Sequence, residues 1–208
     1  MSKYGHRTHN WFESIVNKLG GEEAADRFLR DELSVSKPTR SWHEEDGVIH
    51  FSVTSDGTTG KDWITRLESK EFRVSKYAKQ MLGSPDFKPT SGVTTKVAVL
   101  KGMSFEDKDR ITKNIHAEAD KRKLSKPNAE LACLIREKFT NEEIKQMGLI
   151  CIVVMRKPIH DSARNPVLLH VNCNGVGRWL SSYNGRPDRR WDHDCGFAFA
   201  VSQVSSQP

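Results

Sequence analysis

The chain has 208 residues, of which 36% are hydrophobic and 29% are charged, and its formal net charge is +6. Well-mixed charges and a sufficient hydrophobic fraction exclude a wholly disordered chain. The longest apolar run, from Leu149 to Met155, is far shorter than the roughly 18 residues that a membrane-spanning helix needs. The N-terminal stretch also lacks the apolar centre of a secretory signal peptide. We therefore expect a soluble, cytoplasmic protein without a membrane span.

The positive charge is unevenly distributed along the chain. Residues 1–90 contain 14 Lys and Arg against 14 Asp and Glu, whereas residues 91–208 contain 19 against 13. A modest basic excess permits an anionic partner, such as nucleic acid, but does not require one. Charge alone therefore leaves nucleic-acid binding open.

The four cysteines are scattered along the sequence, and none forms a CxxC pair. In a chain without a signal peptide, such cysteines are most often free thiols. The arrangement of His170, Cys173, His193 and Cys195 does not match a usual zinc motif. We therefore expect no metal site, no cofactor and no catalytic residue, so that a binding protein is favoured over an enzyme.

Residues 1–90 contain five predicted elements. Apolar side chains at three- and four-residue steps predict helices, and apolar–polar alternation predicts a strand. A Gly-Gly pair separates the first two helices. The predicted helices are Asn10–Leu19, Glu22–Leu33, Lys61–Ser69 and Phe72–Leu82, and the predicted strand is Val48–Thr54.

The stretch Gly83–Gly92, with the sequence GSPDFKPTSG, has the composition of a linker. It predicts a domain boundary at residue 90, with a small α+β module over residues 1–90. We expect this module to be docked rather than flexibly linked, because Trp11, Trp42 and Trp63 need burial.

Residues 91–208 are predicted to form an α+β domain with one mainly antiparallel sheet. Helices are expected near residues 110–123 and 128–139, and Thr140 with Glu143 forms the sequence pattern of a capping box for a further short helix. The strands expected to share the sheet are Val93–Leu100, Leu149–Met155, Val167–Val171 and Gly196–Val204.

Residues 172–195, NCNGVGRWLSSYNGRPDRRWDHDC, lose the apolar periodicity of the rest of the domain. Pro187 and several glycines exclude a regular helix. A polar loop of this length inside a compact domain is usually functional or disordered. Two Trp and one Tyr supply large areas to bury, so we interpret the segment as an ordered binding loop with rigid aromatics and adaptable polar residues.

The end of the chain resembles a known family. Arg178-Trp179-Leu180, then Trp191, then Gly196-Phe197-Ala198-Phe199 look like the variable-region end of the variable proteins of diversity-generating retroelements. This resemblance implies a C-type-lectin-like fold, shared with formylglycine-generating enzymes, over residues 91–208. It also implies that a reverse transcriptase diversifies the polar positions. Formylglycine-generating chemistry would need a close pair of C-terminal cysteines, of which Cys195 alone stands near the right position. The whole chain also resembles bacterial proteins of uncultured species, a likeness that assigns no function.

Two functions follow from these patterns. The first is a ligand-binding protein that presents the 172–195 segment to a macromolecule, with a protein as the expected ligand. The alternative is a nucleic-acid-associated protein that uses the basic C-terminal half, because aromatics with arginines bind single strands. Trp179 and Trp191 are expected to be partly buried supports. The expected ligand-facing residues are Tyr183, Asn184, Arg186, Asp188, Arg189, Arg190, Asp192 and His193.

Overall fold

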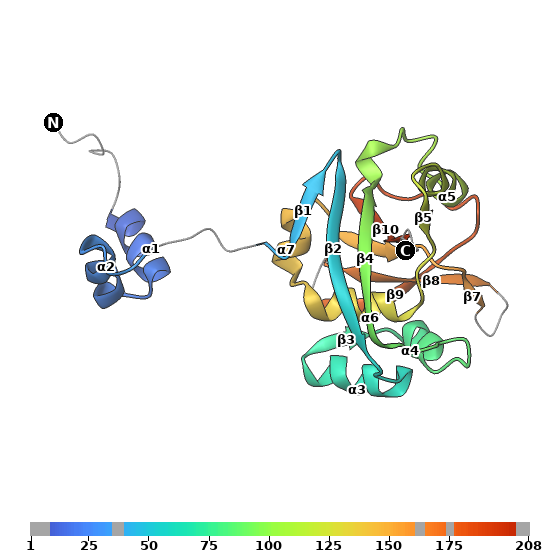
Figure 1. Ribbon diagram of the computed structural model, residues 1–208, viewed down its shortest axis with the longest axis horizontal. Coiled ribbons are helices and arrows are strands. Elements are labelled where there is room, and N and C mark those ends of the chain that lie inside the picture. Colours follow the sequence, from blue (N-terminus) through green and yellow to red (C-terminus); the bar gives the residue numbers. More distant parts are fainter. Residues whose placement is uncertain (1–8, 35–39, 161–164, 174–176, 203–208) are drawn as a thin grey trace, which may run out of the picture. The chain divides into compact units, whose positions relative to one another are not determined.

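The computed structural model describes residues 9–34, 40–160, 165–173 and 177–202. The chain divides into two compact units, Met1–Arg40 and Ser41–Pro208. The first unit consists of helices α1 (His9–Leu19) and α2 (Glu22–Leu29) (Figure 1). Helix α2 ends before Leu33, the end predicted from its apolar spacing, because the chain turns into the left-handed region at Asp31, with φ of 58°. Several apolar side chains of this unit are exposed, namely Trp11, Phe12, Ile15, Phe28 and Leu29.

The second unit is built on one ten-stranded sheet in the order β1-β2-β4-β10-β6-β8-β9-β3, with β5 paired to β10 and β7 paired to β8. The β10–β6 and β9–β3 pairs are parallel and the others are antiparallel. The prediction that four C-terminal strands share one mainly antiparallel sheet is therefore confirmed, although Gly196–Val204 extends past the described residues. The strands are β1 (Trp42–Glu45), β2 (Val48–Asp56), β3 (Phe72–Val74), β4 (Ser91–Lys101), β5 (Leu124–Ser125), β6 (Cys151–Val154), β7 (Ile159–His160), β8 (Pro166–Asn172), β9 (Arg178–Asn184) and β10 (Cys195–Val201).

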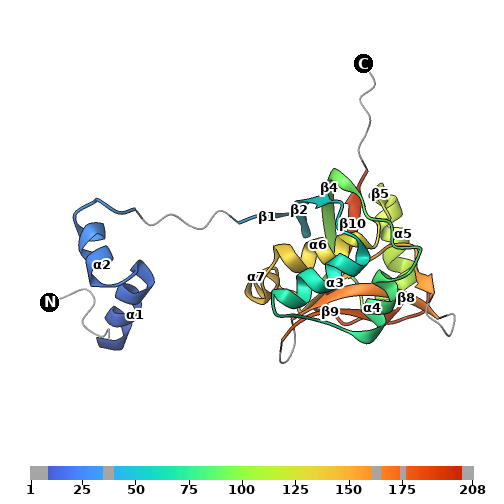
Figure 2. The ribbon, with the colours of Figure 1, turned by 90° about the horizontal axis from the view of Figure 1, so that it is seen from below.

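Helices cover both faces of this sheet. Helix α6 contacts β2, β6, β8 and β9, and Figure 2 shows it between the β2–β4 and β8–β9 parts of the sheet. The sheet therefore curves around α6. Capping residues begin several helices as their sequences indicate: Thr59 accepts from the Asp62 N–H, and Thr140 and Glu143 form the predicted capping box. The helices are α3 (Gly60–Ser69), α4 (Lys76–Leu82), α5 (Thr112–Lys121), α6 (Glu130–Lys138) and α7 (Asn141–Gln146), with a short 3-10 turn, η1 (Gly102–Ser104).

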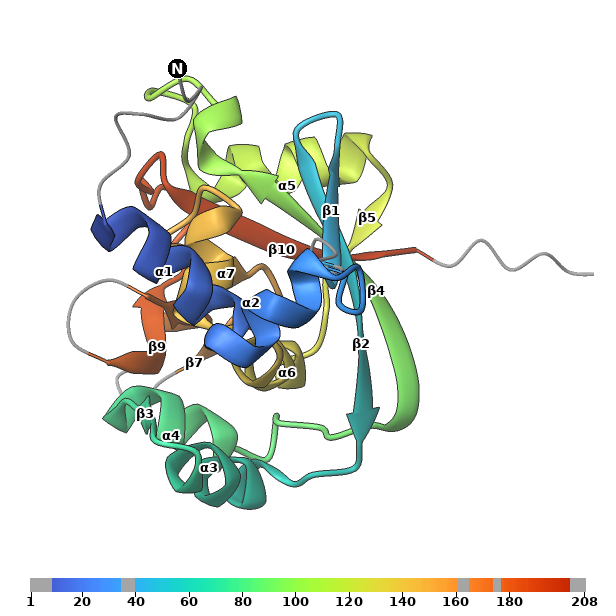
Figure 3. The same ribbon diagram turned by 90° about the vertical axis from the view of Figure 1, so that its left-hand side faces the viewer.

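Two hydrophobic cores lie on opposite faces of the sheet. Because strand side chains alternate, Ala198 of β10 joins the core on the α6 face, whereas Phe197 and Phe199 join the core on the α5 face. Ile115 and Ala119 of α5 close the second core. Figure 3 shows α5 and α6 on opposite sides of β10. The core on the α5 side extends to Trp191 and Cys195.

The domain boundary differs from the expected one at residue 90. Strand β2 pairs with β4 in antiparallel register from Val48↔Leu100 to Asp56↔Ser91, so the sheet runs across that position. The Gly83–Gly92 stretch is packed: Phe87 is 6% exposed, and Thr90 donates from its N–H and its hydroxyl to buried Glu130. Residues 41–90 thus belong to the second unit, and the first unit ends at Arg40.

Two local predictions also require correction. The helix expected over Phe72–Leu82 begins with strand β3, which pairs with β9 before Ser75 caps helix α4. The segment expected to be one loop, residues 172–195, contains strand β9, which pairs with β8 from Asn172↔Trp179 to Val167↔Asn184. The connection that remains after β9 is short, and we call residues 185–194 the 185–194 loop.

Candidate functional site

The 185–194 loop is docked by its backbone on the start of helix α5. The N–H groups of Thr112 and Lys113 donate to the carbonyls of Arg189 and Pro187, at 3.1 and 2.9 Å, and the Trp191 N–H donates to Arg110 at 3.0 Å. These bonds join segments far apart in sequence. They give the loop a defined path over one edge of the α5-side core.

Trp191 anchors the loop from beneath. Its side chain is 5% exposed, and its indole Nε1–H donates to Thr112 Oγ1 at 3.0 Å. Its ring makes edge contacts with Tyr183 and Phe197 at centroid distances of 5.6 and 5.8 Å. Trp191 was expected to be partly buried, and it is instead fully buried with its polar atom satisfied.

The end of the loop is wrapped around Gly102. A Cβ placed on Gly102 would lie 2.8 Å from each of the carbonyl oxygens of Asp192, His193 and Cys195, so that side chains larger than hydrogen are excluded. The Cys195 N–H also closes a turn on the Asp192 carbonyl at 3.2 Å. The backbone from Asp192 to Cys195 is therefore fixed by close packing.

A stack of rings and a guanidinium lies beside this anchor. The rings of His170 and Tyr183 are stacked at 3.9 Å, and the Arg189 guanidinium lies 4.8 Å from the centroid of Tyr183 and 4.9 Å from that of Trp191. Burial, and secondarily the charge of Arg189, lower the pKa of His170 to about 3. His170 is therefore neutral at physiological pH, and its Nδ1 has no hydrogen-bond partner among the described residues.

The predicted ligand-facing residues separate into two groups. Tyr183, Asn184 and Arg189 are half-buried and belong to the support. The other predicted residues lie on the outer side of the loop with exposed side chains: Arg186, Asp188, Arg190, Asp192 and His193.

Trp179 was predicted to support the same loop, but it lies at the other end of β9. It is half-buried there, opposite Arg73 of β3, whose guanidinium is 5.5 Å from its ring. Tyr183 is four positions further along β9, a distance of about 13 Å. Trp191, by contrast, lies directly beneath the loop.

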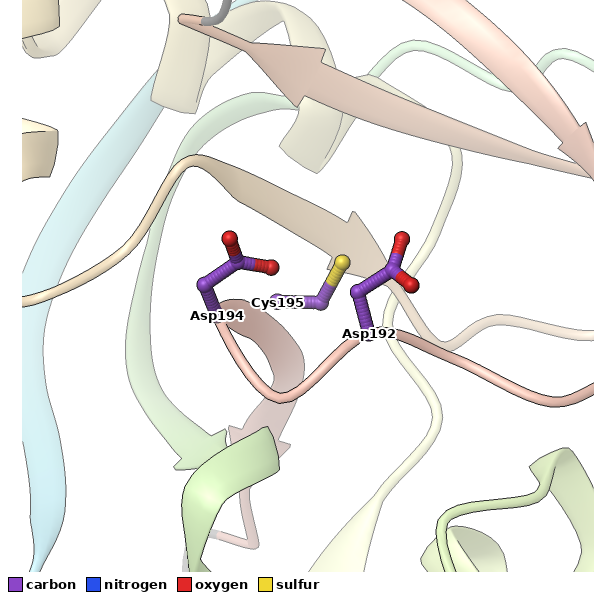
Figure 4. Close-up of side chains that lie close together, drawn as sticks. All are labelled: Asp192, Asp194 and Cys195. Carbon is purple, nitrogen blue, oxygen red and sulfur yellow. The ribbon is translucent and has the colours of Figure 1, made fainter. Parts of the chain in front are cut away.

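Two carboxylates and a thiol also meet at the end of the loop, and a second thiol lies beside that thiol. Cys151 of β6 is the register partner of Cys195 of β10, and ligand atoms of Asp192, Asp194 and Cys195 lie within 4.8 Å of one another (Figure 4). The hydrogen bond with the Cys195 thiol, and then burial, raise the pKa of the Cys151 thiol. Sequence spacing could not reveal this cluster, because Cys151 reads as an ordinary member of a buried apolar strand.

The other two cysteines lie in the opposite core. Cys133 and Cys173 are buried on the α6 face of the sheet, and all four cysteines are free. Burial raises the pKa of both thiols. Cys151 and Cys195 thus differ from Cys133 and Cys173 in lying beside each other and near two carboxylates, and not in their burial.

Comparisons with known proteins add no relative: no family model, curated protein or solved structure matches the chain. Among the described residues, no helix has the length and apolar character needed to cross a membrane. The geometry of the site is therefore the basis on which a function can be proposed.

Proposed function

We propose that the chain is a ligand-binding protein whose recognition surface is the outer side of the 185–194 loop. The observation that supports this function is the separation between anchored and exposed groups. Trp191 and the backbone around Gly102 hold the loop, whereas the side chains of Arg186, Asp188 and His193 make no hydrogen bond or ion pair within the described part of the chain. Exposed side chains on a rigid backbone bind with a small loss of conformational entropy.

The expected ligand is a protein surface. Two exposed arginines alternate with aspartates along the loop: Arg186 and Arg190 with Asp188 and Asp192. Such a mosaic of both signs matches the mixed charges of a protein surface, because electrostatic complementarity fixes partner choice and register. A polyanion would instead be repelled by the carboxylates.

Single-stranded nucleic acid is the alternative ligand, and the ring geometry favours it less. Base stacking needs an accessible aromatic face. Trp191 is 5% exposed, and the Arg189 guanidinium lies over both Trp191 and Tyr183. Titration of a fluorescein-labelled oligothymidine at rising salt separates the two ligands, because phosphate binding weakens steeply with salt. Tight, salt-sensitive binding of this oligonucleotide would contradict the protein-binding proposal.

The direct test exchanges the exposed positions together. Peptides selected from a phage-displayed library against the wild-type protein are titrated against a variant with Arg186→Ser, Asp188→Ser, Arg190→Ser and His193→Ser. We expect binding to be lost, while the free energy of unfolding changes by less than about 0.5 kcal/mol per substitution, as is usual for exposed positions.

A matched control makes the same change in net charge elsewhere. Lys88→Ser, Lys126→Ser and Glu142→Ser alter exposed residues outside the loop, and peptide binding should be retained. Equal binding by wild type and loop variant, or unfolding of the loop variant, would count against the proposal.

We further propose, on the family resemblance of residues 178–199, that this surface is diversified by a retroelement. The resemblance implies adenine-directed changes at the polar positions and a C-type-lectin-like fold. Sequencing of the flanking DNA tests the first implication. A reverse-transcriptase gene together with a near-copy of the final coding segment is expected, and the absence of both from the flanking DNA contradicts diversification.

A further inference from the structure

The start of β10 brings together two carboxylates and a thiol, of which only Asp192 also belongs to the recognition surface. Cys151 and Cys195 are opposite one another on adjacent parallel strands and are 2% and 3% exposed. Asp192 and Asp194 stand on the turn that leads into Cys195. Figure 4 shows the Cys195 sulfur between the two carboxylates. Soft and hard donor atoms therefore meet at one point on the α5 face of the sheet.

The spacing of these groups is close to that of a metal site. The ligand atoms of Asp192, Asp194 and Cys195 lie within 4.8 Å of one another. In a tetrahedral zinc site, with bonds of about 2.0–2.3 Å, neighbouring ligand atoms are about 3.5 Å apart. Donor atoms at the 4.8 Å limit would therefore approach one another by about 1.3 Å on binding an ion.

The backbone that carries these groups is already fixed. The Asp192 and Cys195 carbonyls pack against Gly102, and the Ile150 N–H donates to the Asp194 carbonyl at 2.9 Å. Because Ile150 immediately precedes Cys151, this bond also ties the β6 thiol to the turn. A preformed backbone lowers the entropic cost of binding an ion.

One carboxylate oxygen of the cluster is buried without a hydrogen-bond partner among the described residues. Asp194 Oδ1 is inaccessible to solvent and has no hydrogen-bond partner among the described residues. A buried carboxylate oxygen without a partner is costly unless a cation or a donor compensates it. The thiols beside it cannot supply positive charge, but a divalent ion can.

We propose that Asp192, Asp194 and Cys195 bind a divalent transition metal of the zinc class, with solvent in the fourth position. A thiolate favours zinc over calcium or magnesium, and one sulfur with two carboxylate oxygens and a water molecule gives the four-coordinate set that zinc prefers. Binding replaces the thiol proton of Cys195, which is released to solvent as the metal–sulfur bond forms. Asp192 is shared with the recognition surface, but the recognition test exchanges none of the three donors, so the two proposals can fail separately.

The test uses Co²⁺ as a spectroscopic probe of the reduced, chelator-treated full chain. We expect one equivalent to bind with a near-ultraviolet charge-transfer band from sulfur to cobalt, and Zn²⁺ to displace it. Cys195→Ser should abolish the band, since it removes the one thiolate of the site. Asp192→Asn and Asp194→Asn should each weaken Co²⁺ binding by more than about tenfold.

Controls separate metal binding from misfolding. Cys133→Ser and Cys173→Ser remove buried thiols from the opposite core and should leave the band unchanged. Asp192 is exposed, so its isosteric exchange tests the site without disturbing the core. The proposal is overturned if wild type gives no charge-transfer band, if the band survives in Cys195→Ser, or if the aspartate variants bind Co²⁺ as wild type does.

Discussion

The Gly83–Gly92 stretch and the 185–194 loop have similar compositions and different roles. Both combine glycine, proline and polar residues with one large aromatic residue, yet neither is a free linker. The Gly83–Gly92 stretch directs side chains inward: Phe87 is buried, and Thr90 donates hydrogen bonds to Glu130. The 185–194 loop buries Trp191 and directs its charges outward. Composition marks an irregular segment, but the position of the aromatic residue decides which side chains remain available for binding.

The largest expected effect comes from removing the two aromatic anchors. Phe87→Ala and Trp191→Ala should each lower the free energy of unfolding by about 3–5 kcal/mol, because each deletes a buried aromatic side chain. Urea unfolding monitored by circular dichroism measures the loss. Trp179→Ala serves as the control, with a smaller loss expected at a half-buried ring. If Trp191→Ala cost no more than Trp179→Ala, the loop would not be anchored as described.

A smaller effect is expected from removing the inward-facing hydroxyl of Thr90 in the Gly83–Gly92 stretch. Thr90→Val removes the hydroxyl that donates to Glu130 at 2.8 Å and leaves a buried carboxylate with one bond fewer. We expect a loss of about 1–3 kcal/mol in the free energy of unfolding. Thr54→Val, at an exposed hydroxyl paired with Thr94, should change it by less than about 0.5 kcal/mol. Equal losses would mean that the stretch behaves as a surface linker.

Acid should weaken the support of the 185–194 loop in particular. The pKa of His170 is about 3 in the folded chain and 6.5 in its ordinary state, lowered first by burial and then by Arg189. The unfolded chain therefore binds more protons between these values, and stability is lost as pH falls below about 6.5. The expected loss from this group is about 2 kcal/mol between pH 7 and pH 5.

The pH series is measured by urea unfolding of wild type and of His170→Phe, which keeps a ring stacked on Tyr183. The variant should lose less stability on acidification than wild type by that amount. Parallel pH profiles for the two proteins would show that His170 is not the titrating group.

The sequence predicted the individual helices and strands better than it predicted which of them pair and belong to the same unit. Apolar patterning located α1, α3, β2, β4 and β8. At least one face of α3, β2, β4 and β8 is buried, whereas the apolar side chains of α1 are exposed. The patterning did not detect β9, where the apolar Leu180 stands alone on one face, so that the half-buried strand carries little apolar signal. Pairing across residue 90 could not be predicted either, since β2 and β4 are brought together by register and not by local pattern.

The candidate site was predictable to the same limited degree. Trp191 could be predicted as an anchor because it is a large aromatic residue within a polar segment. The charged residues around it indicated an exposed surface. The partners that complete the site, Thr112, Gly102 and Cys151, come from three other elements and carry no distinguishing spacing. No sequence motif identifies a site that is assembled from several strands and turns, because each of its residues is ordinary in its own local sequence.

Strand β10, which follows the loop, has a consequence for how the protein reaches its fold. It lies between β4 and β6, so the ordered sheet cannot be completed until residues 195–201 have left the ribosome. Until then β4 and β6 each present an unpaired edge, the kind of edge that promotes intermolecular pairing. Contacts between β4 and β10 span about half the chain, which slows folding through the cost of closing a long loop. Newly made chains should therefore depend on chaperones in the interval before β10 inserts.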